Sequence, residues 1–259
     1  MDVIIFSGQS NMQGQAECLS ENAVVNNAYE YKWLTKELAP LKNPVGESIT
    51  YELTNGEPVT NHTDLSWWLS AHALGQACYG HTNLVPSFCR TYTELTGRSV
   101  VAVHAAKGST EIADWMPNGG IYNALKTKAC DCIATVKPER IFFVWLQGES
   151  DAIMQRSKEY YKEHLRILMD ALKKDIGVEL FGMIRVGRFT NDDYDLEIIN
   201  AQDEACQEYD DFIMLTNIAT ELNKMPEFMQ ANVPGHYNAK GLEKLGHEAA
   251  KALADIVNG

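Results

Sequence analysis

Short apolar runs alternate with longer stretches of helical spacing along most of this chain. Five apolar runs predict strands, at residues 3–6, 99–103, 140–146, 179–186 and 211–216. Four segments carry apolar residues at three- and four-residue steps and predict helices, at residues 88–95, 122–136, 160–172 and 242–256. Pro86-Ser87 suits the start of the first of these helices, and Asn238 is a suitable N-cap for the last.

Strands that alternate with helices predict a parallel sheet covered on both faces. We therefore expect an α/β fold, a three-layer αβα sandwich with a central, mostly parallel five-stranded sheet of the flavodoxin-like kind. No repeat or linker interrupts the pattern, so residues 1–259 are expected to form a single domain. Residues 18–80 are weakly periodic and rich in polar and aromatic residues, and we expect loops and short helices that frame a cleft.

Composition narrows the possible partners and locations. At 45% apolar residues, the chain can bury a substantial core. A formal charge of −13 argues against nucleic acid and anionic membranes as partners. Because no stretch approaches the length of a membrane span and no leader pattern precedes the first run, a cytoplasmic location is expected. The oligomeric state stays open.

Neither the cysteines nor most of the histidines show metal-ligand spacing. The six cysteines are too scattered for a disulfide scaffold and are expected to be small, buried or half-buried thiols: Cys18, Cys78, Cys89, Cys130, Cys132 and Cys206. Five histidines are expected to be structural or exposed: His62, His72, His81, His164 and His247. His104 ends a predicted strand, so we expect it to pack near the site. No metal is expected.

Polar clusters follow three of the predicted strands directly. They stand at residues 8–12 (Gly-Gln-Ser-Asn-Met), 107–110 (Lys-Gly-Ser-Thr) and 147–151 (Gln-Gly-Glu-Ser-Asp). Because the carboxyl ends of parallel strands share one edge of the sheet, these clusters should meet there. A fourth cluster, at 235–241, leads into the last helix, so His236 can reach the same edge.

These residue types together suit acyl transfer. A serine hydroxyl becomes a good nucleophile when an imidazole takes its proton, so Ser10 is the candidate nucleophile and His236 the candidate base. The developing oxyanion needs hydrogen-bond donors. The Ser10 N–H, the Gly108 N–H and the Gln147 side-chain amide are expected to supply them.

The four clusters together resemble the SGNH (GDSL-like) hydrolase superfamily. The likeness is greatest to its carbohydrate-esterase branch, the acetylxylan esterase and sialate O-acetylesterase-like proteins. Gly-Gln-Ser-Asn-Met at 8–12, Gly108 with Trp115 after it, Gln-Gly-Glu-Ser-Asp at 147–151 and His236 carry the resemblance. It implies a serine esterase that removes O-acetyl groups from a carbohydrate through an acyl-enzyme, with no cofactor. The substrate would be a small-molecule or oligosaccharide acetyl ester.

One position departs from the superfamily pattern, which places an aspartate three residues before the histidine. Here that position is Val233, which cannot accept the imidazole N–H. Glu149 could be the orienting acid, a role that the resemblance suggests. A backbone carbonyl could orient the ring instead, or the enzyme could be weak. We favour Glu149 as the third catalytic residue.

Three further residues are candidates for substrate binding. Trp115 could offer a sugar-stacking ring, although a packing role at the rim is an alternative, and Gln9 and Asn11 flank the nucleophile. Asp151 is expected to cap a helix N-terminus. Two alternative functions remain: a non-catalytic carbohydrate-binding protein on an esterase scaffold, which Val233 would suit, and a lipid or thioester acyl hydrolase.

Overall fold

A computed structural model describes residues 1–17, 23–47 and 82–259 of the chain. Its centre is a seven-stranded sheet. Across the sheet the strands lie in the order β3 (Glu37–Pro40), β2 (Ala28–Lys32), β4 (Val100–Ala106), β1 (Asp2–Gly8), β5 (Arg140–Leu146), β6 (Leu180–Ile184) and β7 (Phe212–Thr216). All neighbouring strands are parallel except β2 and β3, which form an antiparallel edge.

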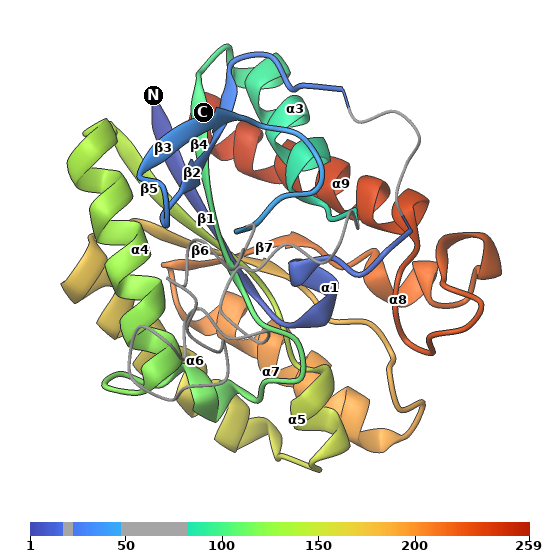
Figure 1. Ribbon diagram of the computed structural model, residues 1–259. Coiled ribbons are helices and arrows are strands. Elements are labelled where there is room, and N and C mark those ends of the chain that lie inside the picture. Colours follow the sequence, from blue (N-terminus) through green and yellow to red (C-terminus); the bar gives the residue numbers. More distant parts are fainter. Residues whose placement is uncertain (18–22, 48–81) are drawn as a thin grey trace, which may run out of the picture.

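Helices cover both faces of the sheet, which gives the three layers expected of an αβα sandwich (Figure 1). One face carries α3 (Val85–Thr96) and α9 (Ala239–Asn258). The other face carries α4 (Gly120–Val136), α6 (Lys158–Ile176) and α7 (Asp193–Glu208). Five shorter helices complete the described part: α1 (Ser10–Gln13), η1 (Ile112–Trp115), α5 (Glu149–Ile153), α8 (Ala219–Leu222) and η2 (Pro226–Phe228).

Alternate residues of the central strands pack into two separate apolar cores, one on each face of the sheet. Val3 and Ile5 of β1 point into the core beneath α4, α6 and α7, whereas Ile4 and Phe6 point into the core beneath α3 and α9. All four side chains are fully buried. Because successive strand residues face opposite sides of a sheet, a continuous apolar run is what a doubly covered strand requires.

The sheet has seven strands, so the expectation of five was wrong in number. The two additional strands, β2 and β3, lie within the segment expected to hold loops and short helices. They form an edge hairpin, and β2 contains Glu30, a buried carboxylate that pairs with Lys32 at 2.7 Å. Both strands are short, and the charged pair in β2 interrupts its apolar residues, so the hydrophobic pattern does not reveal the hairpin. Most of that segment, including Tyr51, Trp67 and Trp68, lies outside the described residues.

The strand order reverses at β1, and this reversal creates the site. β1 lies between β4 and β5, and its last residue, Gly8, is in register with Ala106 on one side and Leu146 on the other. The three strands therefore end level. A crevice outside the carboxyl ends of the strands at such a switch point is where open α/β sheets bind ligands.

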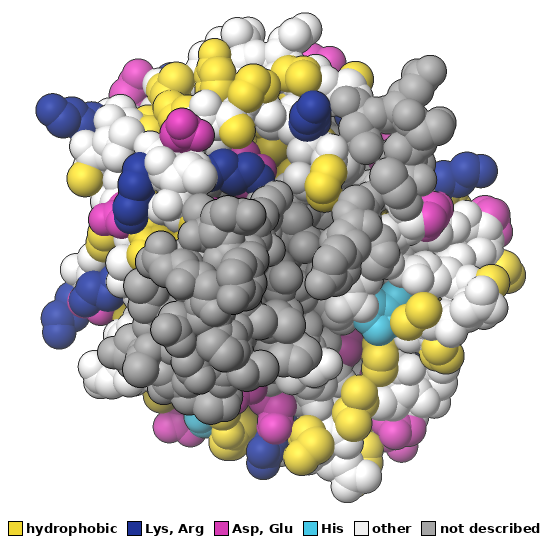
Figure 2. Space-filling view, in the orientation of Figure 1, with side chains coloured by type: hydrophobic (Ala, Val, Ile, Leu, Met, Phe, Trp, Pro, Cys, Tyr) yellow, Lys and Arg dark blue, Asp and Glu magenta, His cyan; other side chains and the backbone are white. Residues whose placement is uncertain are grey.

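The visible surface mixes both signs of charge. Figure 2 shows acidic and basic side chains interspersed on the described part of this face, so a partner that binds there would meet both. In the described ranges, none of the helices has the length and apolar character that crossing a membrane requires.

Candidate active site

Ser10 begins α1 directly beyond the end of β1, and it is 6% exposed. This helix is a single turn of four residues. The first N–H groups of any helix lack an intrahelical acceptor. The Ser10 N–H therefore lies beside its own hydroxyl, at the switch point of the sheet, and is oriented by the turn.

His236 contacts Ser10 across a sequence separation of 226 residues, with Nε2 and Oγ 2.8 Å apart. Its other ring nitrogen, Nδ1, lies 3.0 Å from the carbonyl oxygen of Pro234. A carbonyl oxygen only accepts hydrogen bonds, so Nδ1 must carry the proton in the neutral ring. Nε2 is then the unprotonated nitrogen that faces the hydroxyl. The pair has the geometry of a nucleophile and its general base.

An aromatic ring and a glycine hold the loop that carries His236. The Phe189 ring packs edge-on against the imidazole, with centroids 5.7 Å apart. Gly235 has φ +73°, and a Cβ there would lie 2.1 Å from Phe189 Cδ2, so glycine is required on both counts. Phe189 lies in a loop with no motif, and nothing in the sequence singled it out.

Asn11, in α1 beside the nucleophile, ties the same loop to Glu149. Its Oδ1 accepts a hydrogen bond from the Tyr237 N–H at 3.2 Å, and its Nδ2 donates to the Gly235 carbonyl at 3.3 Å. The amide also donates to Glu149 Oε1 at 2.7 Å. Asn11 is 3% exposed. This side chain is therefore occupied with fixing the histidine loop, which does not fit the expected contact with substrate.

Glu149 occupies the first position of α5 and is 3% exposed. Within the described chain it makes no hydrogen bond to the His236 ring: Oε1 accepts from Asn11, and Oε2 has no hydrogen-bond partner. The expected orienting contact is therefore replaced by the Pro234 carbonyl. Burial raises the pKa of Glu149, while the Asn11 amide and the charge of a protonated His236 act to lower it. Glu149 is thus linked to the histidine loop by hydrogen bonds that run through Asn11.

Gly108 lies against the nucleophile, as expected. A Cβ built on this glycine would be 3.5 Å from Ser10 Cβ, which is van der Waals contact. Its N–H donates a 2.8 Å hydrogen bond to Oε1 of Gln13. The N–H is in the right region for an oxyanion donor, but a neighbouring side chain already uses it.

Gln147 does not fit the expected role of oxyanion donor. It is fully buried, and its Nε2 donates to the Thr110 carbonyl at 2.8 Å, to Asp151 Oδ2 at 2.5 Å and to Gln9 Oε1 at 3.2 Å. An amide nitrogen has only two hydrogens for these three acceptors. Gln147 instead fixes the loops that surround the site.

Gln9 belongs to the same buried network and is 3% exposed. Besides Gln147, its Oε1 accepts from the Ser150 N–H at 3.2 Å. Gln9 therefore anchors the start of α5 to the end of β1, and this does not fit the expected contact with substrate. The sequence placed both glutamines at the correct edge but could not tell which way each side chain turns.

Asp151 caps a different helix from its own. Its Oδ2 accepts from the Ile112 N–H, the first of η1, at 2.9 Å. Oδ1 is buried and finds no hydrogen-bond partner among the residues that the structure describes. Burial raises the pKa of Asp151 to about 7, although the bonds from Gln147 and Ile112 act to lower it. The expected capping role is present, at the start of the neighbouring 3₁₀ helix.

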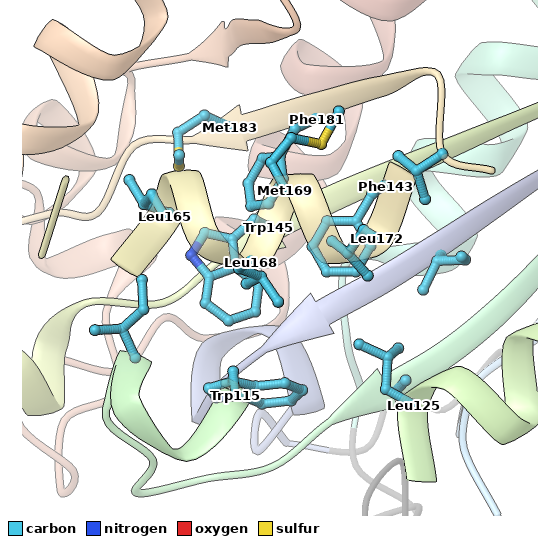
Figure 3. Close-up of a cluster of buried hydrophobic side chains, with 14 of the residues drawn as sticks. Trp115, Leu125, Phe143, Trp145, Leu165, Leu168, Met169, Leu172, Phe181 and Met183 are labelled. Atoms are coloured by element: carbon cyan, nitrogen blue, oxygen red, sulfur yellow. The ribbon is translucent and has the colours of Figure 1, made fainter. Parts of the chain in front are cut away.

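Trp115 is fully buried, which does not fit a substrate-facing ring. Figure 3 shows it in the core beneath α6, near Trp145, and the two rings meet edge to face with centroids 5.2 Å apart. Its Nε1 donates to Thr110 Oγ1 at 3.0 Å. Because η1 turns this position inward and Thr110 satisfies its one polar atom, the ring is a packing element.

The remaining histidines and cysteines are placed as follows. His104 is buried, with Nε2 3.2 Å from the Met12 carbonyl, so it packs beneath the nucleophile turn. The four described cysteines are free thiols, two buried and two half-buried: Cys89, Cys132, Cys130 and Cys206. Several candidates lie outside the described residues: Cys18, Cys78, His62, His72 and His81. No group of three or more metal-ligating side chains gathers anywhere in the described ranges.

Comparisons with known proteins match this chain to one family. Residues 1–255 match the family described as carbohydrate esterase, sialic acid-specific acetylesterase. No curated protein matches the chain.

Solved structures share the fold at low sequence identity. A protein of Arabidopsis thaliana has a TM-score of 0.71 at 15% identity, with 98% of each chain covered. NanS has a TM-score of 0.66 at 11% identity, covering 99% of this chain and 97% of that one. A carbohydrate acetylesterase from Xanthomonas citri has a TM-score of 0.55 at 15% identity, where the whole of this chain spans 56% of the other.

Proposed function

The chain belongs to the sialic acid-specific acetylesterase family of carbohydrate esterases, and we propose that Ser10 and His236 carry out its ester hydrolysis. It is a carboxylic ester hydrolase of the SGNH type that removes O-acetyl groups from a carbohydrate. The observation that carries the assignment of residues is the 2.8 Å contact between Ser10 Oγ and His236 Nε2. The Pro234 carbonyl at Nδ1 supports it, because this contact selects the tautomer that can accept the hydroxyl proton.

In the acylation step, Ser10 Oγ attacks the acetyl carbonyl carbon while His236 Nε2 takes the hydroxyl proton. The tetrahedral intermediate collapses when the bond to the sugar oxygen breaks, and His236 returns the proton to that oxygen. The deacetylated sugar leaves an acetyl-enzyme on Ser10. Water, deprotonated by His236, then attacks the same carbonyl carbon and forms a second tetrahedral intermediate. When the bond to Ser10 Oγ breaks, His236 returns the proton to that oxygen and acetate is released.

Two backbone N–H groups are proposed as the oxyanion donors, those of Ser10 and Gly108. Ser10 itself carries the attacking oxygen, and Gly108 lies beside it, since a Cβ built on Gly108 would be 3.5 Å from Ser10 Cβ. Backbone donors need no reorganisation as the negative charge develops, and losing one such donor typically costs about a hundredfold or more in rate.

Glu149 is proposed as a positioning and electrostatic residue. Its bond to Asn11 helps to fix the amide that holds the Gly235 carbonyl and the Tyr237 N–H, and so fixes the histidine. The negative charge of an ionised Glu149 also favours the imidazolium that forms during each proton transfer. Pro234 takes over the orienting role that an aspartate at position 233 would have.

The two alternative functions are not favoured. A non-catalytic role was suggested by Val233 in place of an acid, and the Pro234 carbonyl supplies the acceptor that this substitution removed. A lipid or thioester acyl hydrolase would prefer long acyl chains, so a series of 4-nitrophenyl esters of increasing chain length distinguishes it. We expect acetate to be the best substrate of that series.

A direct assay tests the proposed function. Purified protein is incubated with 4-nitrophenyl acetate, with an O-acetylated sialic acid and with an acetylated xylo-oligosaccharide. We expect acetate release from the sialic acid by the wild type and by a Ser99→Ala control, which makes the same substitution far from the site. Ser10→Ala should release none while keeping the wild-type melting temperature. Equal activity of Ser10→Ala and the wild type would overturn the proposal.

A further inference from the structure

The Gly108 N–H, proposed above as an oxyanion donor, is occupied from within the chain. Gln13 Oε1 accepts its hydrogen bond at 2.8 Å, a good length for an amide donor and a neutral acceptor. An acyl oxygen on a carbon attacked by Ser10 would need the same N–H. The two acceptors compete, because one backbone N–H directs one strong hydrogen bond.

Gln13 and the nucleophile converge on the same face of Gly108. A Cβ built there would lie 3.2 Å from Gln13 Oε1 and 3.5 Å from Ser10 Cβ. Gln13 is the last residue of α1, three positions after Ser10, so the two share a single turn. The amide oxygen of Gln13 therefore holds the Gly108 N–H, the donor that a substrate carbonyl attacked by Ser10 would need.

The backbone of Gln13 is fixed, so its side chain is the part that can move. Its N–H donates to the Gln9 carbonyl at 2.8 Å, and its carbonyl accepts from Asn83 Nδ2 at 3.4 Å. A glutamine side chain has three rotatable bonds, so Oε1 can leave the Gly108 N–H while these two backbone hydrogen bonds stay in place.

We propose that Gln13 is an autoinhibitory residue of the oxyanion hole. In the free enzyme its side-chain amide oxygen holds the Gly108 N–H, and the acetyl carbonyl oxygen of the substrate displaces it before Ser10 attacks. The inference rests on the proposed function, because it takes the Gly108 N–H as an oxyanion donor. It assigns Gln13 a role that sets how readily an ester enters the reactive position.

The strength of the hydrogen bond that Gln13 gives up sets the size of the expected change in kcat/KM. A neutral hydrogen bond exchanged for another in a folded protein is worth about 0.5–1.5 kcal/mol, which corresponds to a change of up to about tenfold in kcat/KM. A carboxylate at position 13 would accept from Gly108 more strongly, since charge-assisted hydrogen bonds are about twice as strong. It would also repel the oxyanion.

Two variants of similar shape and opposite expected effect test the proposal. Gln13→Met keeps the volume and removes the acceptor, so kcat/KM for 4-nitrophenyl acetate should rise by up to about tenfold. Gln13→Glu keeps the shape and strengthens the acceptor, so kcat/KM at pH 8 should fall by about tenfold or more. If Gln13 merely supported the loop at 107–110, both variants would be impaired. A fall or no change in Gln13→Met would overturn the proposal.

A trapped adduct gives a second test that does not depend on the variants folding. A methylphosphonate ester that phosphonylates Ser10 places an oxygen in the oxyanion position of the wild-type enzyme. Its crystal structure should show that oxygen on the Gly108 N–H and Gln13 Oε1 withdrawn from it. An adduct on Ser10 in which Gln13 still accepts from Gly108 would overturn the inference and leave the proposed nucleophile intact. Failure to phosphonylate Ser10 while esterase activity persists would instead count against the proposed function.

Discussion

The Asn11 amide donates a 2.7 Å hydrogen bond to Glu149, and this bond takes the place of a contact between Glu149 and His236. The carboxylate is thus linked through Asn11 to the backbone on either side of His236, at Gly235 and Tyr237. Because the Pro234 carbonyl already holds Nδ1, the charge of Glu149 is not needed to select the tautomer. This arrangement separates the two tasks that one aspartate performs in a Ser-His-Asp triad.

Glu149→Gln should therefore be a mild variant. Glutamine can still accept from Asn11 and removes only the charge, so we expect kcat/KM to fall by less than about a hundredfold, whereas loss of a directly orienting acid costs about ten thousandfold. Steady-state kinetics with 4-nitrophenyl acetate measure this, with Glu159→Gln on α6 as the matched control. A loss as large as that of His236→Ala would show that Glu149 orients the ring directly.

Restoring the superfamily aspartate should bring little gain. Val233 is 38% exposed, and the Nδ1 proton already has an acceptor at 3.0 Å. We expect Val233→Asp to change kcat by no more than about fivefold, since an exposed ion pair contributes at most about 1 kcal/mol. The readout is kcat over pH 6 to 9. An increase well above tenfold would mean that the carbonyl orients His236 poorly.

Trp115 should matter for stability and hardly at all for substrate binding. Truncating a fully buried tryptophan typically costs about 3–5 kcal/mol, so Trp115→Ala should lower the free energy of unfolding by about that amount. Trp115→Phe retains most of the packing, and its KM for the acetylated sugar should equal that of the wild type. Denaturant unfolding and steady-state kinetics provide the two measurements. A large rise in KM with stability unchanged would restore the stacking role.

Asp151 should make stability depend on pH. Its ordinary pKa is 3.8, and in the folded protein it is about 7. The folded state therefore holds the Asp151 proton more tightly than the unfolded state does. The stability that this group contributes is fully present below about pH 4 and is lost as the pH rises to about 7. The melting temperature of Asp151→Asn relative to wild type should increase from pH 5 to pH 8. A difference that stays constant over this range would contradict the assignment.

The parts of the site that the sequence could predict are those fixed by strand ends. Ser10, Gly108 and Glu149 follow three parallel strands that end level, and parallel pairing alone brings such residues to one edge. The apolar runs identified those strands because they are buried on both faces. The hairpin of β2 and β3 escaped detection because Glu30, a buried charge, interrupts its pattern.

The parts that the sequence could not predict concern directions and backbone atoms. Gln147 and Gln9 have the right chemistry for donors at the site, yet both are turned into a buried network that no local pattern records. The orienting group on His236 is a main-chain carbonyl, and every residue has one. Only the geometry of the loop, set by Gly235 and Phe189, selects that of Pro234.

The central claim is that Ser10 and His236 act as one catalytic unit, and a double-mutant cycle on kcat/KM tests it most directly. Ser10→Ala and His236→Ala should each lose about a thousandfold or more, and the double variant should lose no more than either, because residues that act together are not additive. His164→Ala, a histidine on α6 that bonds the Tyr160 carbonyl, serves as the matched control and should keep wild-type activity. Losses that simply multiply in the double variant, or a Ser10→Ala enzyme as active as wild type, would contradict the account.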